Sequence, residues 1–265
     1  MRAERIVSRL RVAIGEQLKN CPQVVTLGVR SQIGDYTEKE RELLRAADII
    51  FYPTARFVDL FTTLGKVTFP TVNCYHLRGN RVKQIALLRM LDIPYPRTRV
   101  YYGRKQKQKI LEDFAFPLIA KSPLGSAAGR GVFFIEDSDT LEQYKRKFNP
   151  AYIQEHVPTE MVVQVAVINY ETVFGSCRRV AGSESRGILG HAGTWQTKYI
   201  PPEAITLGTN IARQGNLSDV TVEMICNGSQ FQVVELTFQC DEIWHHHHGQ
   251  ERFKTILEMI EQGEL

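Results

Sequence analysis

The chain has 265 residues, of which 43% are apolar, and it carries a formal net charge of +4. This length and apolar content are enough for a full hydrophobic core in two or three compact lobes. Lysine and arginine are scattered among almost as many acidic residues, so the composition does not indicate a nucleic-acid-binding protein. No apolar run reaches the length of a membrane span. The composition therefore indicates a globular protein.

The cysteines argue against two kinds of stabilising site. Their number is odd and none has CxxC spacing, which disfavours both a disulfide framework and a zinc site. A reducing, cytoplasmic setting is therefore expected. The five cysteines are Cys21, Cys74, Cys177, Cys226 and Cys240.

The first nineteen residues predict an amphipathic helix. Apolar residues stand four apart at Ile6, Leu10, Ile14 and Leu18, and arginines alternate with them. The long apolar stretch of a secretory signal is missing, so such a signal is not expected. A targeting or membrane-surface role is the alternative to an ordinary packed helix, because basic amphipathic helices occur in both settings.

The following segment predicts a parallel βαβ unit. Thr37 and Glu40 stand at the two positions of a capping box, which marks the start of a helix. Apolar runs typical of buried strands lie on both sides of this helix. We expect a small parallel-sheet lobe that ends near residue 78. Its predicted elements are a strand at 24–29, a helix at 37–47 and a strand at 48–52.

A strand, a glycine-bearing loop and a second strand follow one another in residues 116–135. Val-Phe-Phe-Ile follows the glycines, where a P-loop or a dinucleotide fold would open a helix, so we expect a β-hairpin. Lys121 at the end of the first strand offers a cation, and the small residues let backbone N–H groups approach phosphate oxygens. A plain turn is the alternative, but it would not need so many small residues.

The remaining elements follow from apolar periodicity and turn residues. Residues 182–194 are rich in glycine and serine, which indicates a functional loop or partial disorder. Helices are expected at 81–91, 105–114, 141–148, 204–213 and 252–260, strands at 99–102, 152–155, 220–225 and 230–236, and a hairpin over 162–180.

The order of these segments resembles the ATP-grasp superfamily. The features that carry the resemblance are Lys121 with its loop, Tyr152-Ile-Gln-Glu155, and the acidic strands around Glu223 and Glu235. They span about residues 78–244 and are most similar to the amino-acid ligase subgroup that includes ribosomal-protein glutamate ligases. The resemblance implies an α/β (α+β) ATP-grasp fold. Its expected domains are a small parallel-sheet domain at 1–78, a lid at 79–153 and a C-terminal lobe with a metal site at 154–265.

The resemblance also implies a site for ATP. Lys121 would hold the α- and β-phosphates, and Arg81 or Lys83 would hold a second phosphate. The loop would close over the triphosphate, the segment after residue 153 would contact adenine, and Glu160 would reach the ribose. The implied nucleotide-binding residues are Arg81, Lys83, Lys121, Ser126, Gly129, Arg130, Gly131, Gln154, Glu155, Val157, Glu160 and Gln164.

Glu223 and Glu235 take the family's magnesium positions on neighbouring strands, with manganese as an alternative ion. Thr237 would be a further, weaker oxygen donor. Two acids in such apolar strands would be costly unless a cation or partner offset them.

The implied chemistry is that of an ADP-forming carboxylate–amine ligase: ATP phosphorylates a carboxylate, and an amine then attacks the acylphosphate. The substrates would be small molecules or peptides, and self-association is left open. The implied catalytic cations are Arg178, Arg179 and Lys198, although a solvated strand end explains one of the two arginines equally well.

Three positions depart from the family pattern. Thr237 replaces an asparagine, and Gln196 replaces an arginine. The family's Asp-x-Arg falls on Val162-Val163-Gln164 in one register, or its aspartate falls on Gln164 in another, and a charge is missing either way. These changes leave open a nucleotide-binding protein without ligase activity, although Asp241 and Glu242 could compensate at the metal site. A basic RNA-associated module is a third alternative, and it requires strongly salt-dependent binding.

Four consecutive histidines at 245–248 have two interpretations. They could bind a transition metal or line the substrate pocket, because they follow the predicted metal-binding strand. A compositional tract without function is the more common case.

Overall fold

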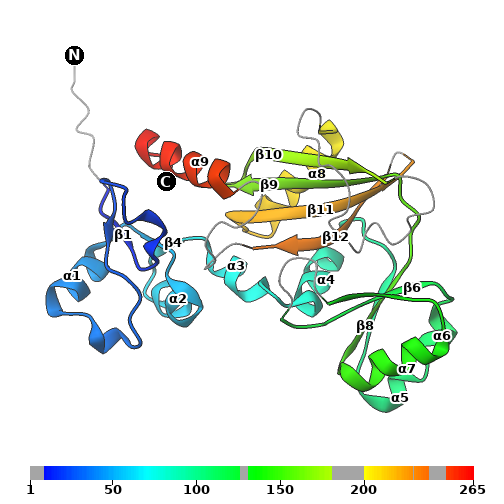
Figure 1. Ribbon diagram of the computed structural model, residues 1–265. Helices are drawn as coiled ribbons and strands as arrows, with labels where there is room; N and C mark the ends of the chain where they lie inside the picture. Colours follow the sequence, from blue (N-terminus) through cyan, green and yellow to red (C-terminus); the bar gives the residue numbers. More distant parts are fainter. Residues whose placement is uncertain (1–8, 126–130, 181–199, 229, 239–248) are drawn as a thin grey trace. The chain divides into compact units, whose positions relative to one another are not determined.

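A computed structural model shows the helices and strands of the chain (Figure 1). The described residues are 9–125, 131–180, 200–228, 230–238 and 249–265. Two compact units are present. The N-terminal unit comprises Met1–His76, Asn216–Asp219 and Gln239–Leu265, and the central unit comprises Leu77–Gly215 and Val220–Phe238. As domain limits, the ranges 1–78, 79–153 and 154–265 stay a prediction.

The N-terminal unit contains a parallel sheet with the strand order β2-β1-β3-β4. The expected parallel-sheet lobe is therefore confirmed. Its strands are β1 (Arg11–Ala13), β2 (Val25–Thr26), β3 (Ile49–Phe51) and β4 (Val67–Phe69). Its helices are α1 (Glu38–Ala46), α2 (Thr54–Thr63), α3 (Val72–Leu77) and α9 (Gly249–Gln262), with short 3-10 turns at Glu16–Leu18 and Ile33–Asp35.

The helix predicted for the first nineteen residues is wrong where the structure describes it. Val12 and Ala13 lie in β1, the strand between β2 and β3, and both are fully buried together with Ile14. A short strand covered on both faces has a continuous apolar sequence, and here that run coincided with a four-residue spacing. Residues 1–8 lie outside the described residues.

Helix α1 begins as the sequence predicts. The Thr37 backbone N–H donates to Glu40 Oε2 at 2.7 Å, and the Glu40 N–H donates to Thr37 Oγ1 at 3.3 Å. The reciprocal bonds satisfy two backbone donors at the helix start. The predicted capping box is therefore confirmed. It was predictable from sequence because its two residues lie within one helical turn.

A buried ion pair ties α9 into the N-terminal unit. Arg252 of α9 is 1% exposed and pairs with Asp219, which is fully buried. Burial lowers the pKa of the Arg252 guanidinium to about 10, so it remains charged at neutral pH. Removing Arg252 would therefore leave the buried Asp219 carboxylate without this ion pair.

The central unit contains two four-stranded sheets. The first has the order β5-β8-β6-β7 and is antiparallel throughout. The β6–β7 pairing confirms the predicted hairpin around the glycine-bearing loop. The strands are β5 (Thr98–Tyr101), β6 (Leu118–Lys121), β7 (Val132–Ile135) and β8 (Ala151–Glu155).

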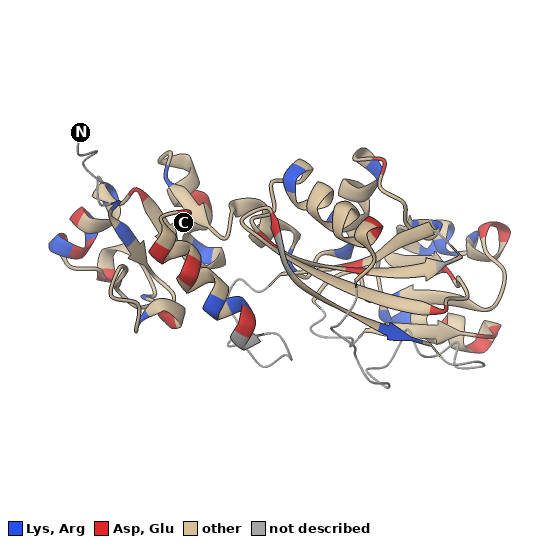
Figure 2. Ribbon diagram, turned by 90° about the horizontal axis from the view of Figure 1, so that it is seen from above, with Lys and Arg blue, Asp and Glu red and all other residues tan. Residues whose placement is uncertain are grey.

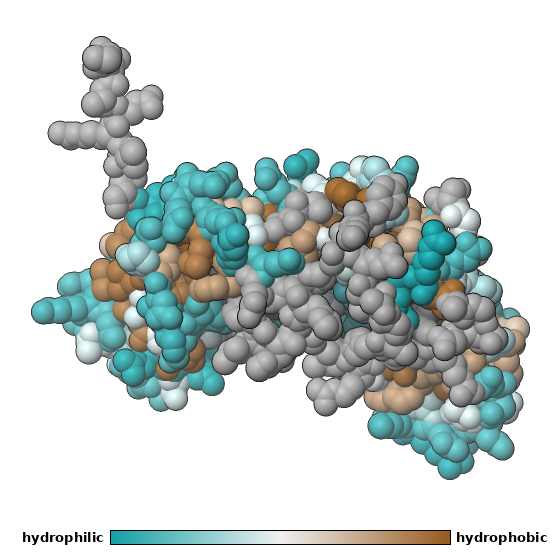
Figure 3. Space-filling view, turned by 45° about the horizontal axis from the view of Figure 1, so that its top comes forward, coloured by the Kyte–Doolittle hydropathy of each residue, from teal (hydrophilic) through white to brown (hydrophobic). Residues whose placement is uncertain are grey.

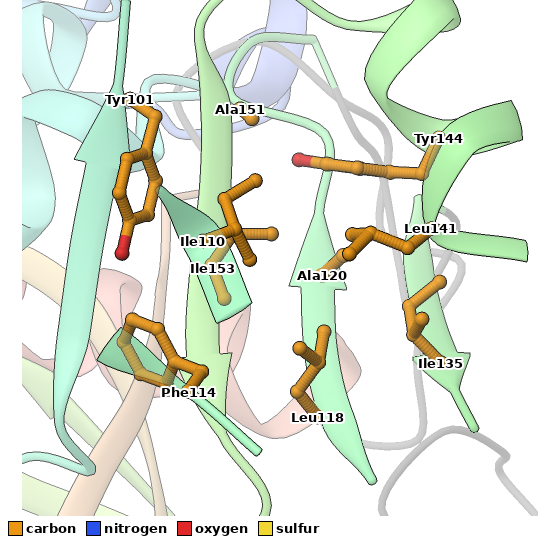
Figure 4. Packing of buried hydrophobic residues seen from close by; sticks show 10 residues of the cluster. All are labelled: Tyr101, Ile110, Phe114, Leu118, Ala120, Ile135, Leu141, Tyr144, Ala151 and Ile153. Atoms are coloured by element: carbon orange, nitrogen blue, oxygen red, sulfur yellow. The ribbon is translucent and has the colours of Figure 1, made fainter. Parts of the chain in front are cut away.

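One face of this sheet packs against helices to form the core shown in Figure 4. Leu118 and Ala120 of β6 point into that core, so Ile119 and Lys121 point to the opposite face, because side chains alternate along a strand. The covering helices are α5 (Gly103–Lys107), α6 (Ile110–Asp113) and α7 (Ser138–Lys147). The single helix predicted at 105–114 is thus two short helices, α5 and α6.

The second sheet has the order β10-β9-β11-β12. Helix α8 covers one of its faces: a Cβ added to Gly208 would lie 3.1 Å from Val165 Cγ1. The β9–β10 turn has positive φ at Asn169 (48°) and Tyr170 (66°), as a tight hairpin turn requires. The elements are β9 (Met161–Ile168), β10 (Glu171–Arg179), α8 (Pro202–Gln214), β11 (Asp219–Asn227) and β12 (Gln230–Thr237).

Helix α4 (Arg81–Met90) also belongs to the central unit, and it begins with the Asn80 side chain accepting from the Lys83 N–H. Basic and acidic segments are interspersed along both units (Figure 2), and polar residues surround small apolar areas on the face shown in Figure 3. Of the helices in the described ranges, none combines the length and apolarity that crossing a membrane requires.

Replacing Arg252 by methionine should destabilise the fold, because the Asp219 carboxylate would stay buried without its cation. We expect a loss of about 3–5 kcal/mol in the free energy of unfolding, measured by urea denaturation at pH 7. The matched control is Lys254→Met on the same helix, where the side chain is 78% exposed. Equal losses in the two variants would contradict the role of the ion pair.

Candidate active site

Lys121 lies at the end of β6 and is 4% exposed. Its Nζ donates to the carbonyl oxygen of Val234 at 2.7 Å. Val234 is the extra residue of a β-bulge, because Glu223 pairs with Glu235 while the next residue, Met224, pairs with Val233. Bulges reorient groups next to active sites, and this one presents a main-chain oxygen to the lysine.

Tyr144 of α7 holds the main chain on which Lys121 is mounted. Its hydroxyl donates to the Lys121 carbonyl at 2.6 Å and accepts from the Tyr152 N–H at 2.9 Å. Lys121 and Tyr152 are paired across β6 and β8, so one hydroxyl bridges both strands. Burial raises the pKa of Tyr144, which keeps the hydroxyl protonated as a donor.

Three polar side chains form a row across the second sheet. Gln164 of β9 donates from Nε2 to Glu223 Oε2 at 2.7 Å, and Glu223 of β11 is the direct cross-strand partner of Glu235 on β12. Directly opposed residues share a face. Because Val165 of β9 contacts α8, this row lies on the other face, which we call the carboxylate face.

Two cations offset the charge of this row. Arg81 Nη2 donates to Glu235 Oε1 at 2.6 Å. Burial lowers the pKa of Lys121 to about 8, while the nearby Glu235 and Glu223 carboxylates oppose that shift and Arg81 adds to it. Lys121 is therefore still mostly protonated at pH 7. Like charges directly opposite would otherwise destabilise the strand pair.

Glu223 and Glu235 supply hard oxygen ligands of the kind that magnesium and manganese bind. Within the described ranges, no group of three or more His, Cys, Asp or Glu residues could hold a metal ion by itself. The pair therefore fits a cation that takes its remaining oxygens from water or from a phosphate substrate, as magnesium commonly does.

Of the two alternatives for a second phosphate-binding cation, only Arg81 lies beside the other charged groups. Arg81 is 4% exposed, and its Nη1 donates to the carbonyl oxygen and the hydroxyl of Ser122 at 3.1 and 3.2 Å. Lys83 is exposed, two positions further along α4. Residues two apart do not face the same side of a helix.

The predicted adenine segment leaves the sheet at the end of β8. Gln154 is buried and donates to Thr98 Oγ1 at 2.9 Å, while Glu155 Oε1 accepts from the Arg97 N–H at 2.6 Å. Val157 is half-buried and Glu160 is exposed. The segment is thus anchored by side chains at its beginning and more open further on.

The two arginines of β10 point to opposite faces. Arg178 is buried opposite Val162, and Arg179 is exposed opposite Met161. Arg178 shares the carboxylate face, because Val162 is two positions from Gln164 on β9. Thr237 also lies on that face, two positions after Glu235, and it is exposed.

The structure describes the two ends of the glycine-bearing loop, up to Gly125 and from Gly131. The Ser122 N–H donates to the Gly131 carbonyl at 2.7 Å, which closes the two strand ends. Several predicted residues lie outside the described residues: Ser126, Gly129, Arg130, Lys198, Gln196, Asp241, Glu242 and 245–248.

Tyr144, Ser122 and the Val234 carbonyl are parts of the site that the sequence did not indicate. Ser122 directly follows Lys121, so its position was a usable signal. Nothing in the sequence marks Tyr144, which has the apolar spacing of a core residue in α7, or predicts the bulge at Val234.

The family model of the RimK-like ATP-grasp domain matches residues 78–244. The chain belongs to this family. The α/β ATP-grasp fold expected from the order of segments is therefore confirmed. No curated protein matches the chain.

Solved ATP-grasp structures share this fold over nearly the whole chain. A RimK domain ATP-grasp protein from Sphaerobacter thermophilus DSM 20745 is 17% identical, with a TM-score of 0.66 and coverage of 94% of this chain and 97% of that chain. D-alanine–D-alanine ligase from Bacillus anthracis is 12% identical, with a TM-score of 0.67 and 96% coverage of both chains. ATP-grasp ligase PsnB, solved with minimal precursor, Mg and ADP, is 12% identical, with a TM-score of 0.66 and coverage of 97% and 99%. At these identities the likeness establishes the fold.

Replacing Arg81 by methionine should destabilise the protein by about 1.5–3 kcal/mol, because the Glu235 carboxylate loses a charged hydrogen-bond donor. The double variant Arg81→Met/Glu235→Gln should recover part of that loss, since no uncompensated carboxylate remains at position 235. Urea unfolding of the single and double variants measures the coupling.

Lys83→Met is the matched control for the Arg81 variants, because this lysine is exposed on the same helix turn. It should change the free energy of unfolding little. Strictly additive effects of the Arg81 and Glu235 substitutions would show that the ion pair does not couple them.

Proposed function

We propose that the protein is an ATP-dependent ligase that joins a carboxylate to an amine and releases ADP and phosphate. The observation that carries the proposal is the convergence of Lys121, Arg81, Glu223 and Glu235, which come from four separate elements. Membership of an ATP-grasp family and the ligases among the solved structures support the same reaction class.

Lys121 and Arg81 are proposed to bind the phosphates of ATP. Glu223 and Glu235, with Thr237, are proposed to hold magnesium, or manganese in its place, which would neutralise phosphate charge. The glycine-bearing loop would cover the phosphates with Ser126, Gly129, Arg130 and Gly131. The adenosine end is assigned to Gln154, Glu155, Val157 and Glu160.

The proposed reaction has two displacements. An oxygen of the carboxylate attacks the γ-phosphorus of ATP, the bond to the β-phosphate oxygen breaks, and ADP leaves. The amine nitrogen then attacks the acyl carbon, phosphate departs, and the nitrogen loses a proton to solvent. Arg178 on the carboxylate face would hold the anionic group being transferred, with Arg179 and Lys198 as further candidates.

A second candidate function is nucleotide binding without turnover. The observation that favours it is the hydrogen bond from Gln164 to Glu223. An acid in place of Gln164 would add negative charge to attract a cation, whereas the glutamine amide is neutral. The amide also occupies one oxygen of the Glu223 carboxylate, which weakens the metal site. The same bond also orients Glu223, so it is compatible with both functions.

The proposed substrates are small molecules or peptides, and a reducing compartment such as the cytoplasm is the proposed location. Four cysteines in the described part of the chain form no disulfide: Cys21, Cys74, Cys177 and Cys226. Burial raises the pKa of Cys74 to about 11, which suppresses its thiolate.

The decisive experiment measures ADP release by the purified protein with ATP, magnesium, a panel of carboxylates and hydroxylamine as a general amine. We expect carboxylate-dependent ADP release that Glu235→Gln reduces at least a hundredfold, because one metal-binding charge is removed. Calorimetric ATP binding serves as the parallel measurement. Tight ATP binding without carboxylate-dependent release would favour the second function.

ATP affinity should fall as the pH rises above about 8. The pKa of Lys121 is lowered to about 8 in the folded protein, so the ammonium that attracts phosphate is lost above that pH. Loss of this one proton can weaken ATP binding by at most about tenfold per pH unit. Calorimetry between pH 7.5 and 9.5 measures the affinity.

Lys121→Met is the control for this pH dependence. Its ATP binding should be weak at every pH and should lose the decline above pH 8. A wild-type affinity that stays level up to pH 9.5 would exclude Lys121 as the phosphate-binding cation.

A further inference from the structure

Ser176 on β10 has a buried hydroxyl group whose environment within the described residues offers no hydrogen bond. The residue is 1% exposed, and its Oγ has no partner there. A buried hydroxyl that has given up water without gaining a partner costs free energy. Alanine at this position would avoid that cost, which suggests that the hydroxyl has a partner other than the described residues, such as a bound ligand.

The hydroxyl lies on the carboxylate face. Ser176 is the direct cross-strand partner of Gln164, and opposed residues share a face. The side chain of Cys177, the next residue of β10, therefore points to the face covered by α8. Arg178, two positions further along β10, shares the face with Ser176.

Ser176 extends the row of polar side chains to the far edge of the sheet. The row runs from Ser176 on β10 through Gln164 on β9 and Glu223 on β11 to Glu235 on β12. Its acidic end suits a cation. The β10 end has no carboxylate in the row, and Arg178 lies on the same face two positions along the strand, so this end suits an anion.

We propose that Ser176 is a substrate-binding residue whose hydroxyl donates a hydrogen bond to an oxygen of the carboxylate substrate. The inference rests on the proposed ligase function and adds the place of the carboxylate: the β10 end of the row, with ATP and its metal at the β11–β12 end. Gln164, which lies between the two ends, is neutral. It therefore does not repel an anion, as an acidic residue at that position would.

The test uses the full chain with ATP and magnesium, hydroxylamine as the amine, and amino acids and dicarboxylates as carboxylate probes, with hydroxamate as the product measured. For the best probe, Ser176→Ala should raise the KM for the carboxylate about tenfold or more. ATP affinity by calorimetry should stay unchanged. Ser176→Thr, which retains a hydroxyl, should restore much of the lost affinity.

Cys177→Ala is the matched control, because its side chain points to the opposite face of the same strand. It should leave the KM for the carboxylate unchanged. Wild-type activity with an unchanged KM in Ser176→Ala would overturn the assignment. Weaker ATP binding in that variant would also overturn it, because the anionic oxygen would then belong to ATP.

Thermal unfolding without substrate separates a binding role from a structural one. Since the Ser176 hydroxyl lacks a partner among the described residues, Ser176→Ala should unfold at the same temperature as the wild type or higher. A midpoint several degrees lower would show a structural hydrogen bond and overturn the proposal. If the wild type binds ATP but forms no hydroxamate with any probe, the ligase function itself fails, and the assignment fails with it.

Discussion

The pairing of Glu223 and Glu235 across β11 and β12 is the constraint on which the central unit depends. Two carboxylates paired across neighbouring strands repel each other and need cations close by. Arg81 arrives from the start of a helix, and Lys121 arrives from a strand of the other sheet. Burial works against the lysine charge while the carboxylates sustain it. The site is thus an electrostatic balance that only the folded chain can assemble.

Strand alternation separates packing from chemistry in both sheets of the central unit. Leu118 and Ala120 fill the core beneath the helices (Figure 4). Side chains alternate along β6, which leaves Lys121 on the opposite face. In the second sheet, Val165 lies against α8 while Gln164 lies beside Glu223. A shift of one residue in either register would exchange the two sets. Precise strand pairing is therefore a requirement of the site as well as of the core.

Features that depend on neighbouring residues were predictable. The capping box of Thr37 and Glu40 spans a single helical turn, and the β6–β7 hairpin follows from Val-Phe-Phe-Ile after the glycines. The position of Lys121 at the end of the first strand of this hairpin was predictable for the same reason. The N-terminal strand was missed because a three-residue strand between two others carries no alternation, and its apolar residues fitted a helical spacing by chance.

The sequence by itself determined the fold class and the β6–β7 hairpin, because both follow from local patterns and from the order of segments. The same patterns predicted the charged residues of the candidate site. Only the tertiary structure decided that Arg81 rather than Lys83 meets Glu235, that Tyr144 supports Lys121, and that Ser176 ends the polar row. These contacts join residues far apart in the chain or depend on strand register and helix rotation. Such relations are set by packing, which no short stretch of sequence encodes.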